Sequence, residues 1–328
     1  MIFLIFALAI FFAMNMGGAS FAACFATTYG SKILRAKISI IFFISCVILG
    51  SVLFGKNVSV TLGKDVIPSE LISQKSLFVI FLSAGFSMFI SNMMKIPQST
   101  SLVTVAAIAG VGGYFGQLNV KTISYFIPFW IILPLLSFGL TFAFGSFIYP
   151  PRSQNFWIYE RFVNQRNKLR NFVIFASCYN AFSVGTNNVA NVVGPLLAWG
   201  QSPWSGNPWS ISSILFYLFV FAYFYGLGSI VFTGPLKTAG EQIVPLGLLS
   251  ASMISMVSGT LIIIASICGV PQSFVMLQMG AIFAISSLKQ GHEVTFSSDI
   301  ARKALYTWSI NPVITYFVSM GLCWVIFH

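Results

Sequence analysis

Two short stretches of the sequence place glycine beside hydroxyl and amide side chains inside otherwise apolar segments. Their glycine and polar members are Gly17, Gly18 and Ser20 in the first stretch, and Gly185, Thr186, Asn187, Asn188 and Asn191 in the second. Backbone N–H groups freed at a glycine break, together with amide and hydroxyl donors, can bind an anion without a formal positive charge. The alternative is close packing of helices through small residues. The three asparagines exceed what packing requires, so the second stretch favours an anion site more strongly than the first.

A second pair of motifs predicts helix starts with the same chemistry. Pro97-Gln98-Ser99-Thr100-Ser101 recurs in shortened form as Pro271-Gln272-Ser273. Proline suits the first turn of a helix, because the N–H that it lacks would have no partner there. The candidate ligands from these motifs are Gln98, Ser99, Thr100, Gln272 and Ser273. Helix capping is the alternative, and it applies most to the positions that the second copy does not keep.

Ionisable side chains are missing from the interior of the apolar segments. Charged residues within a membrane are expensive and usually mark ion or proton pathways. The nearest candidates for ion coupling are Glu241, Lys237 and His292, which fall in short polar connections and could equally be solvated loop residues. Neither a metal cluster nor an acid–base pair is predicted, so we expect no enzyme activity, no metal and no cofactor. No phosphate-binding loop of the G-x-x-x-x-G-K-[ST] type occurs, so ATP is not the predicted driving force.

The elements that must position these residues are membrane-spanning helices. Of the 328 residues, 57% are hydrophobic and 7% are charged. Apolar runs long enough to cross a bilayer recur along the whole chain. They lie near 2–29, 38–54, 76–94, 97–116, 125–149, 171–199, 209–233, 243–265, 269–287 and 304–327. The first and sixth runs are long enough to be two half-helices broken at their glycine motifs. The predicted fold is therefore an all-α polytopic membrane protein with 10–12 transmembrane helices and broken or re-entrant segments at the midplane.

The distribution of positive charge along the chain indicates how the protein is oriented in the membrane. The net charge is +11. If the N-terminus is outside and each run crosses once, all the basic residues lie inside except Lys56, Lys64, Lys75 and Lys121. This is the positive-inside bias of a plasma-membrane protein. We therefore predict a multi-pass protein of the plasma (inner) membrane with both termini outside. The bilayer, and no nucleic acid, is the partner that the charge indicates.

The two halves of the chain carry the same motifs in the same order. Gly17 corresponds to Gly185, and the first proline–glutamine–serine motif corresponds to the second. Residues 1–149 and 171–328 then form two transmembrane repeats, joined by a basic cytoplasmic linker at 150–170. A unit of five crossings ends on the side opposite its start, so the second copy must be inverted. Inverted repeats with broken helices at matching positions are typical of secondary transporters.

At these motifs the chain resembles the inorganic phosphate transporter family. That family carries a pattern like G-A-N-D-V-A-N-A in each half, followed later by P-V-S-T-T-H. The second copy here, beginning at Gly185, is closer to this pattern than the first, and the resemblance spans the whole chain. Two departures matter most, because Ser20 and Asn188 stand where the family has aspartate.

The departures imply a change of substrate within the family. Hydrogen phosphate can donate its proton to a carboxylate, whereas sulfate carries no proton and would be repelled by one. Loss of both carboxylates also weakens any sodium site, because hard cations prefer anionic oxygen ligands. The pattern resembles the sulfate permease branch, whose members are thought to couple to protons. It implies a proton-coupled importer of sulfate or thiosulfate, with sodium as the less favoured ion, and the family resemblance suggests a homodimer. The alternatives are a phosphate transporter with an altered site and a passive anion channel.

Overall fold

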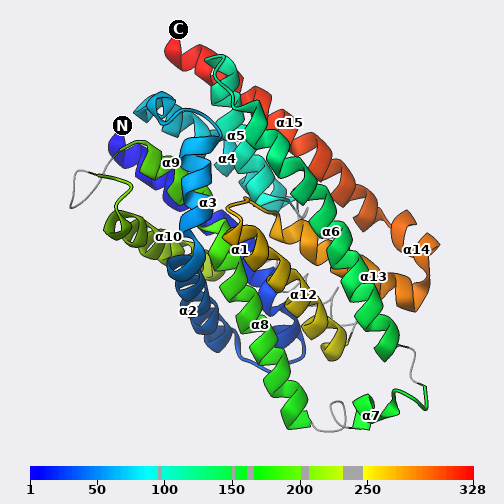
Figure 1. Cartoon of the computed structure of the whole chain (residues 1–328). Coiled ribbons are helices and arrows are strands. Elements are labelled where there is room, and N and C mark those ends of the chain that lie inside the picture. The colour runs from blue at the N-terminus through cyan, green and yellow to red at the C-terminus, as the bar shows by residue number, and fades with distance from the viewer. Residues whose placement is uncertain (95–97, 150–151, 161–165, 201–206, 232–246) are drawn as a thin grey trace.

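The structure is a computed structural model and describes residues 1–94, 98–149, 152–160, 166–200, 207–231 and 247–328 (Figure 1). These residues form helices and no strand. In chain order the elements are α1 (Ile2–Gly30), α2 (Ala36–Phe54), α3 (Lys56–Val60), the π-helical turn η1 (Thr61–Asp65), the 3-10 turn η2 (Ser69–Leu71), α4 (Gln74–Met93), α5 (Thr100–Tyr114), α6 (Val120–Ile148), α7 (Phe156–Ile158), α8 (Arg166–Asn188), α9 (Ala190–Ala198), α10 (Ile211–Val231), α12 (Leu248–Ile267), α13 (Phe274–Gln290), α14 (His292–Ser297) and α15 (Asp299–Phe327).

The helical membrane architecture predicted from the sequence is confirmed. Each of the ten apolar runs overlaps at least one helix, and the sixth run covers most of α8 and the whole of α9. Among the described residues, seven helices are long and apolar enough to cross a membrane. Helices form because a bilayer offers no water to satisfy backbone N–H and C=O groups, so the segment must pair them internally. Five helix starts are set by serines that each accept a bond from the N–H three residues later: Ser73, Ser99, Ser210, Ser273 and Ser298.

The first glycine motif does not break its helix. α1 runs without interruption from Ile2 to Gly30, so the predicted half-helix at Gly17 and Gly18 is wrong. In the second half the helix is interrupted at Val189, after Asn188, rather than at Gly185. Even there, Val189 keeps helical dihedrals, with φ −63° and ψ −32°. Glycine permits a departure from helical geometry but does not impose one, and tertiary contacts explain its presence here.

The glycines allow four helices to cross at backbone distance. A Cβ placed on Gly17 of α1 would overlap the carbonyl oxygen of Tyr225 in α10, and one on Gly228 of α10 would overlap that of Met14. The crossing of α8 and α2 is built the same way. There Gly185 approaches the carbonyl oxygen of Val47, and Gly50 approaches that of Phe182. In both crossings each glycine faces the residue that lies three positions before the partner glycine. Close packing through small residues is therefore the role of Gly17 and Gly185 in the fold.

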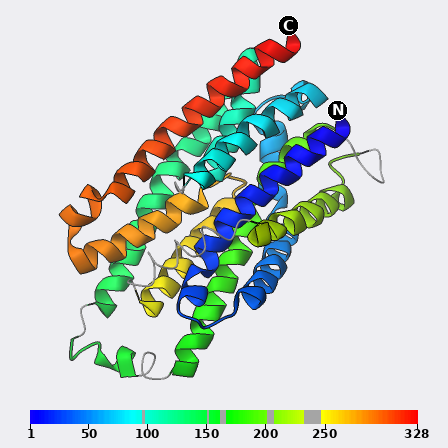
Figure 2. The ribbon, with the colours of Figure 1, turned by 180° about the vertical axis from the view of Figure 1, so that it is seen from behind.

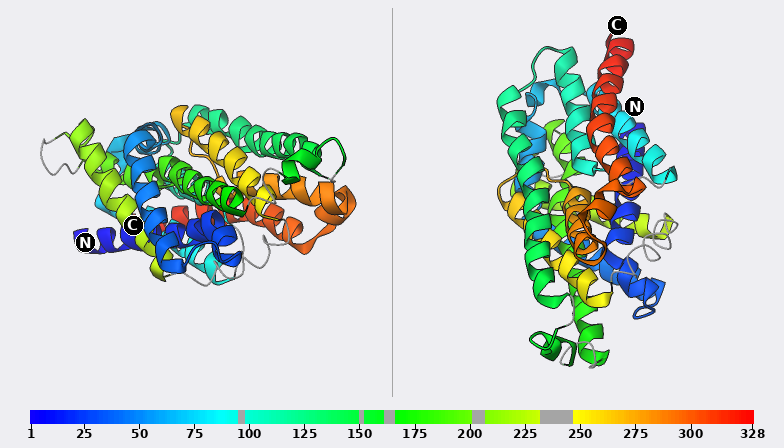
Figure 3. Two further views of the ribbon diagram at one scale, coloured as in Figure 1. Left: turned by 90° about the horizontal axis from the view of Figure 1, so that it is seen from below. Right: turned by 90° about the vertical axis from the view of Figure 1, so that its right-hand side faces the viewer.

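Two helical hairpins bring the serine-capped helix starts together. α4 packs beside α5, and α12 beside α13, and the first turns of α5 and α13 lie near the centre of the molecule (Figure 1). Figure 2 shows α1 and α10 lying side by side on the opposite face of the bundle. Both termini lie at one end of the molecule, and α7 lies at the other (Figure 3). The tips of the two hairpins touch, because the Ser101 hydroxyl donates to the Gln272 carbonyl oxygen at 2.9 Å.

Candidate anion-binding site

The motif serines hold the starts of α5 and α13 at the hairpin tips. The Ser99 hydroxyl accepts from the Leu102 N–H, and the Ser273 hydroxyl accepts from the Met276 N–H, each at 3.2 Å. Both serines are buried, as is Thr100 in the first turn of α5. The first turn of a helix leaves backbone N–H groups without intrahelical partners and carries the positive end of the helix dipole. Two such helix starts therefore meet in the protein interior, and the serines act there as caps.

Asn187 fastens α8 to α12 and to the loop before α13, and Thr186 fastens α8 to α12. The Asn187 amide donates to the Ser266 hydroxyl and to the Val270 carbonyl oxygen, both at 2.9 Å, and its carbonyl accepts from the Gln272 N–H at 3.0 Å. The Thr186 hydroxyl bonds the Ser183 carbonyl at 2.7 Å and the Ser266 hydroxyl at 2.8 Å. These two predicted ligands are thus occupied with protein partners. This geometry supports a role for Asn187 in positioning Gln272, and for Thr186 in holding α8 on α12, rather than direct contact with a ligand.

Ser20 and Asn188 come together on one tyrosine hydroxyl. The Asn188 amide donates to the Tyr225 hydroxyl at 3.2 Å, and that hydroxyl donates to the Ser20 hydroxyl oxygen at 2.6 Å. All three side chains are buried. Sequence reasoning missed Tyr225. The available signal was a hydroxyl-bearing aromatic residue inside an apolar run, but α10 contains three tyrosines and the sequence does not single out one of them.

Several predicted ligands carry buried amide atoms that have no hydrogen-bond partner. These atoms are Gln98 Oε1, Asn188 Oδ1, Asn191 Oδ1, and both Nε2 and Oε1 of Gln272. An unpaired buried polar group costs about 1–3 kcal/mol, so native proteins rarely keep one without a reason. Rotation of a side-chain amide by 180° exchanges its oxygen and nitrogen, so each such group can present either an acceptor or a donor.

Asn191 of α9 is linked through Ser101 to both hairpin tips. The Asn191 amide donates to the Ser101 hydroxyl at 3.4 Å, and that hydroxyl donates to the Gln272 backbone carbonyl. Gln98 is anchored through its nitrogen, which donates to the Ser87 hydroxyl at 2.9 Å. Within the described residues, none of the buried polar side chains is charged. The site therefore offers neutral donors and helix starts, which is the chemistry of an anion site built without cations.

Of the three predicted coupling residues, only His292 belongs to the part of the chain that the structure describes. Glu241 and Lys237 lie outside the described residues. His292 is exposed at the start of α14, and its ring stacks on Phe142 of α6 at 5.6 Å between centroids. No group of three or more His, Cys, Asp or Glu that could hold a metal ion is found in the part of the chain that the structure describes.

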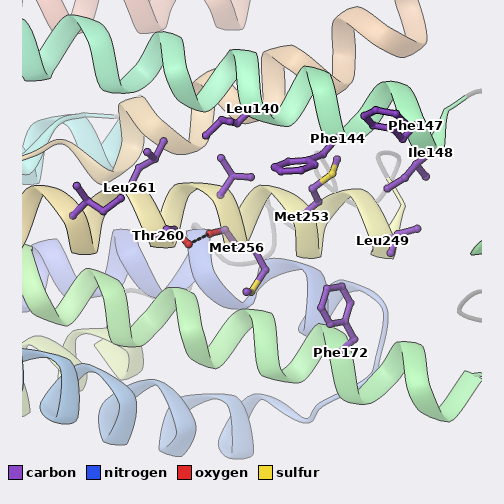
Figure 4. A pocket seen from close by; sticks show the side chains of 12 residues that line it. Leu140, Phe144, Phe147, Ile148, Phe172, Leu249, Met253, Met256, Thr260 and Leu261 are labelled. Carbon is purple, nitrogen blue, oxygen red and sulfur yellow. Dashed lines mark hydrogen bonds between the residues drawn. The ribbon is translucent and has the colours of Figure 1, made fainter.

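An apolar pocket lies away from the polar cluster. It has a volume of about 560 Å³ and is lined by side chains of α6, α8 and α12, including Phe144, Phe172 and Met253 (Figure 4). The Thr260 hydroxyl is turned to the Met256 carbonyl at 2.8 Å. None of the predicted ligands lines this pocket, and its hydrocarbon walls cannot compensate an anion for lost water. It is not a candidate for the anion site.

The known proteins that this chain resembles are named as phosphate transporters or as permeases for phosphate or sulfate. The profile of the phosphate transporter family matches residues 16–156 and 152–319. The chain is 30% identical to the sulfate permease CysP of Bacillus subtilis, over 94% of this chain and 84% of that protein. It is 21% identical to a candidate phosphate permease of Methanocaldococcus jannaschii, over 93% and 91% of the two chains. Its fold matches a solved structure described as the sodium-dependent phosphate transporter with a TM-score of 0.83, covering 99% and 98% of the two chains at 19% identity.

Proposed function

The chain belongs to the phosphate transporter family of inorganic anion transporters, and on this premise we propose that it imports sulfate by proton-coupled secondary transport. Thiosulfate is the close analogue that the same site would accept. The proposed ligands are the neutral groups at the hairpin tips and on α8 and α9, chiefly Gln98, Asn188, Asn191 and Gln272, together with the first turns of α5 and α13. The relative named as a sulfate permease supports this choice over phosphate.

The neutrality of the buried cluster carries the proposal. Sulfate is fully deprotonated at neutral pH, so every one of its oxygens can only accept hydrogen bonds. A carboxylate can also only accept, and in a buried site it would repel the dianion. Ser20 and Asn188 replace the two aspartates of the family pattern, and the structure joins them through an uncharged hydroxyl. The absence of these carboxylates also favours a proton over sodium as the coupled ion.

We further propose that residues 1–149 and 171–328 are inverted repeats joined by the linker at 150–170. Support comes from packing that recurs with the halves exchanged. α1 packs on α10 as α8 packs on α2, and α5 packs on α15 as α13 packs on α6. The two glycine crossings follow the same exchange. Both termini lie at one end of the molecule, and α7, which belongs to the proposed cytoplasmic linker, lies at the other (Figure 3). This arrangement agrees with the proposed topology, in which both termini are outside and the linker is inside.

Uptake of labelled sulfate into cells that lack their own sulfate transporter tests the proposal. We expect saturable uptake that depends on the protein and is competed by thiosulfate more strongly than by phosphate. No uptake, or uptake competed fully by phosphate but not by thiosulfate, would contradict the sulfate assignment. The second result would favour a phosphate transporter with an altered site.

Accumulation against a gradient separates a carrier from a channel. In proteoliposomes with an imposed pH gradient, acidic outside, we expect sulfate to accumulate above its external concentration. A protonophore should abolish this accumulation, and replacing sodium with another monovalent cation should leave it unchanged. Equilibration without accumulation would indicate a passive anion channel.

Gln272→Met tests whether an unpartnered amide serves the substrate. Methionine matches glutamine in length and lacks the buried amide that has no protein partner, so we expect the melting temperature in detergent to stay equal or rise. Sulfate uptake should fall about tenfold or more, because a donor to the anion is lost. Gln278→Met is the contrasting control, because the Gln278 amide donates to the Ala23 carbonyl oxygen at 2.8 Å. Loss of this hydrogen bond in Gln278→Met should lower the melting temperature. Lower stability with normal uptake in Gln272→Met would remove Gln272 from the site.

A further inference from the structure

We propose that Tyr225 is a positioning residue for substrate recognition, whose hydroxyl turns the Asn188 amide so that its N–H group faces the oxyanion. This inference rests on the proposed function of the site and adds a residue that neither motif contains. Tyr225 would act through Asn188 of the second half of the chain and Ser20 of the first half, because its hydroxyl is hydrogen-bonded to both.

The phenol is held rigidly between the two halves. Tyr225 is fully buried in α10, and its ring stacks on Phe43 of α2 with centroids 6.2 Å apart and planes 28° from parallel. Its backbone carbonyl is pressed against Gly17 of α1. Both ends of the residue are therefore fixed, and the hydroxyl is held at one point between Ser20 and Asn188. A rigid hydroxyl at a fixed point can orient a neighbouring amide, because the amide rotates more easily than the ring moves.

The hydrogen-bond chain can run in either direction. In the structure Asn188 donates to Tyr225, and Tyr225 donates to Ser20. This direction leaves Asn188 Oδ1 buried without a partner. In the reverse direction Ser20 donates to Tyr225, Tyr225 donates to Asn188 Oδ1, and the rotated amide has its N–H groups free. Each hydroxyl keeps its own proton, so the reversal needs rotations only.

A fully deprotonated oxyanion is bound best in the reverse direction, because that direction frees both N–H groups of the Asn188 amide and pairs its carbonyl oxygen, whereas the observed direction uses one N–H on Tyr225 and leaves the carbonyl oxygen unpaired. Such an anion accepts hydrogen bonds and donates none, so it binds the N–H face of Asn188 and is repelled by the carbonyl face. Because Tyr225 has a single proton, it can donate to Ser20 or to Asn188 but not to both. The Tyr225 hydroxyl therefore allows the Asn188 amide to turn its N–H groups toward the anion while the Asn188 carbonyl oxygen still accepts a hydrogen bond. Without it, the carbonyl of Asn188 would be buried and unpaired whenever the amide served the anion.

The test is sulfate uptake by Tyr225→Phe, with KM and maximal rate measured separately. We expect KM to rise about tenfold, the effect of losing one buried hydrogen bond, while the maximal rate stays within about twofold and the melting temperature is nearly unchanged. Tyr223→Phe is the matched control, because Tyr223 is on the same helix and is 46% exposed. Its KM should equal that of the wild type.

The same substitution in an Asn188→Ala protein distinguishes a positioning role of Tyr225 from a general effect on stability. In Asn188→Ala, adding Tyr225→Phe should change KM by less than about twofold, because the amide that the hydroxyl orients is already gone. An unchanged KM in Tyr225→Phe, or an effect that multiplies fully in the Asn188→Ala background, would overturn the inference. Wild-type protein without sulfate uptake would instead contradict the proposed function.

Discussion

Asn188→Asp is expected to reduce sulfate uptake at least about 100-fold with little change in the fold. The substitution keeps the size and shape of the side chain and replaces a potential donor by a carboxylate. Two unit charges about 4 Å apart repel by about 4 kcal/mol at an effective dielectric constant of 20, and sulfate carries two charges. Hydrogen phosphate can donate its proton to the new carboxylate, so competition by phosphate should rise relative to sulfate.

The measurement is initial uptake of labelled sulfate, normalised to the protein present in the membrane. Asn119→Asp is the control, because Asn119 is exposed and caps α6 by accepting from the Thr122 N–H, which an aspartate can also do. It adds the same charge outside the buried cluster, and uptake should stay at the wild-type level. Unchanged sulfate uptake in Asn188→Asp would place Asn188 outside the site.

Gly17→Ala is expected to destabilise the protein and to abolish most uptake. The new methyl group would overlap the Tyr225 carbonyl oxygen, so α1 and α10 must separate. Overpacking of this kind costs about 1–3 kcal/mol or more, which outweighs the gain of about 1 kcal/mol from the better helix propensity of alanine. Separation of these helices also moves the Tyr225 hydroxyl away from Ser20, one turn along α1 from Gly17.

Melting temperature in detergent and uptake in cells are the two measurements for this variant. Gly139→Ala in α6 is the matched control, because a Cβ there meets no neighbouring heavy atom within 4 Å. Its melting temperature should be unchanged or slightly higher. A Gly17→Ala protein with wild-type melting temperature and uptake would show that the α1–α10 contact can open without consequence, contrary to the packing described here.

Local patterns in the sequence were sufficient for the helices and for part of the site. The apolar runs predicted helices that the structure contains, and the proline–glutamine–serine motifs predicted the starts of α5 and α13. The same patterns misplaced the breaks. The motif at Gly17 predicts a backbone break, whereas the missing side chain of this glycine allows contact with α10. A glycine needed for a break and a glycine needed for close approach look the same in one sequence.

Composition and the length of the apolar runs are enough to predict a helical membrane protein whose interior polar groups are uncharged amides and hydroxyls. These properties, and the requirement that membrane segments pair their own backbone groups, do not depend on long-range contacts. How the polar groups are used depends on the packing of the helices. This packing ties Asn187 to the loop before α13, leaves Gln272 without a side-chain partner, and joins Ser20 to Asn188 through Tyr225. Ser20 and Tyr225 are 205 positions apart in the chain, and helix packing rather than any local periodicity brings them together.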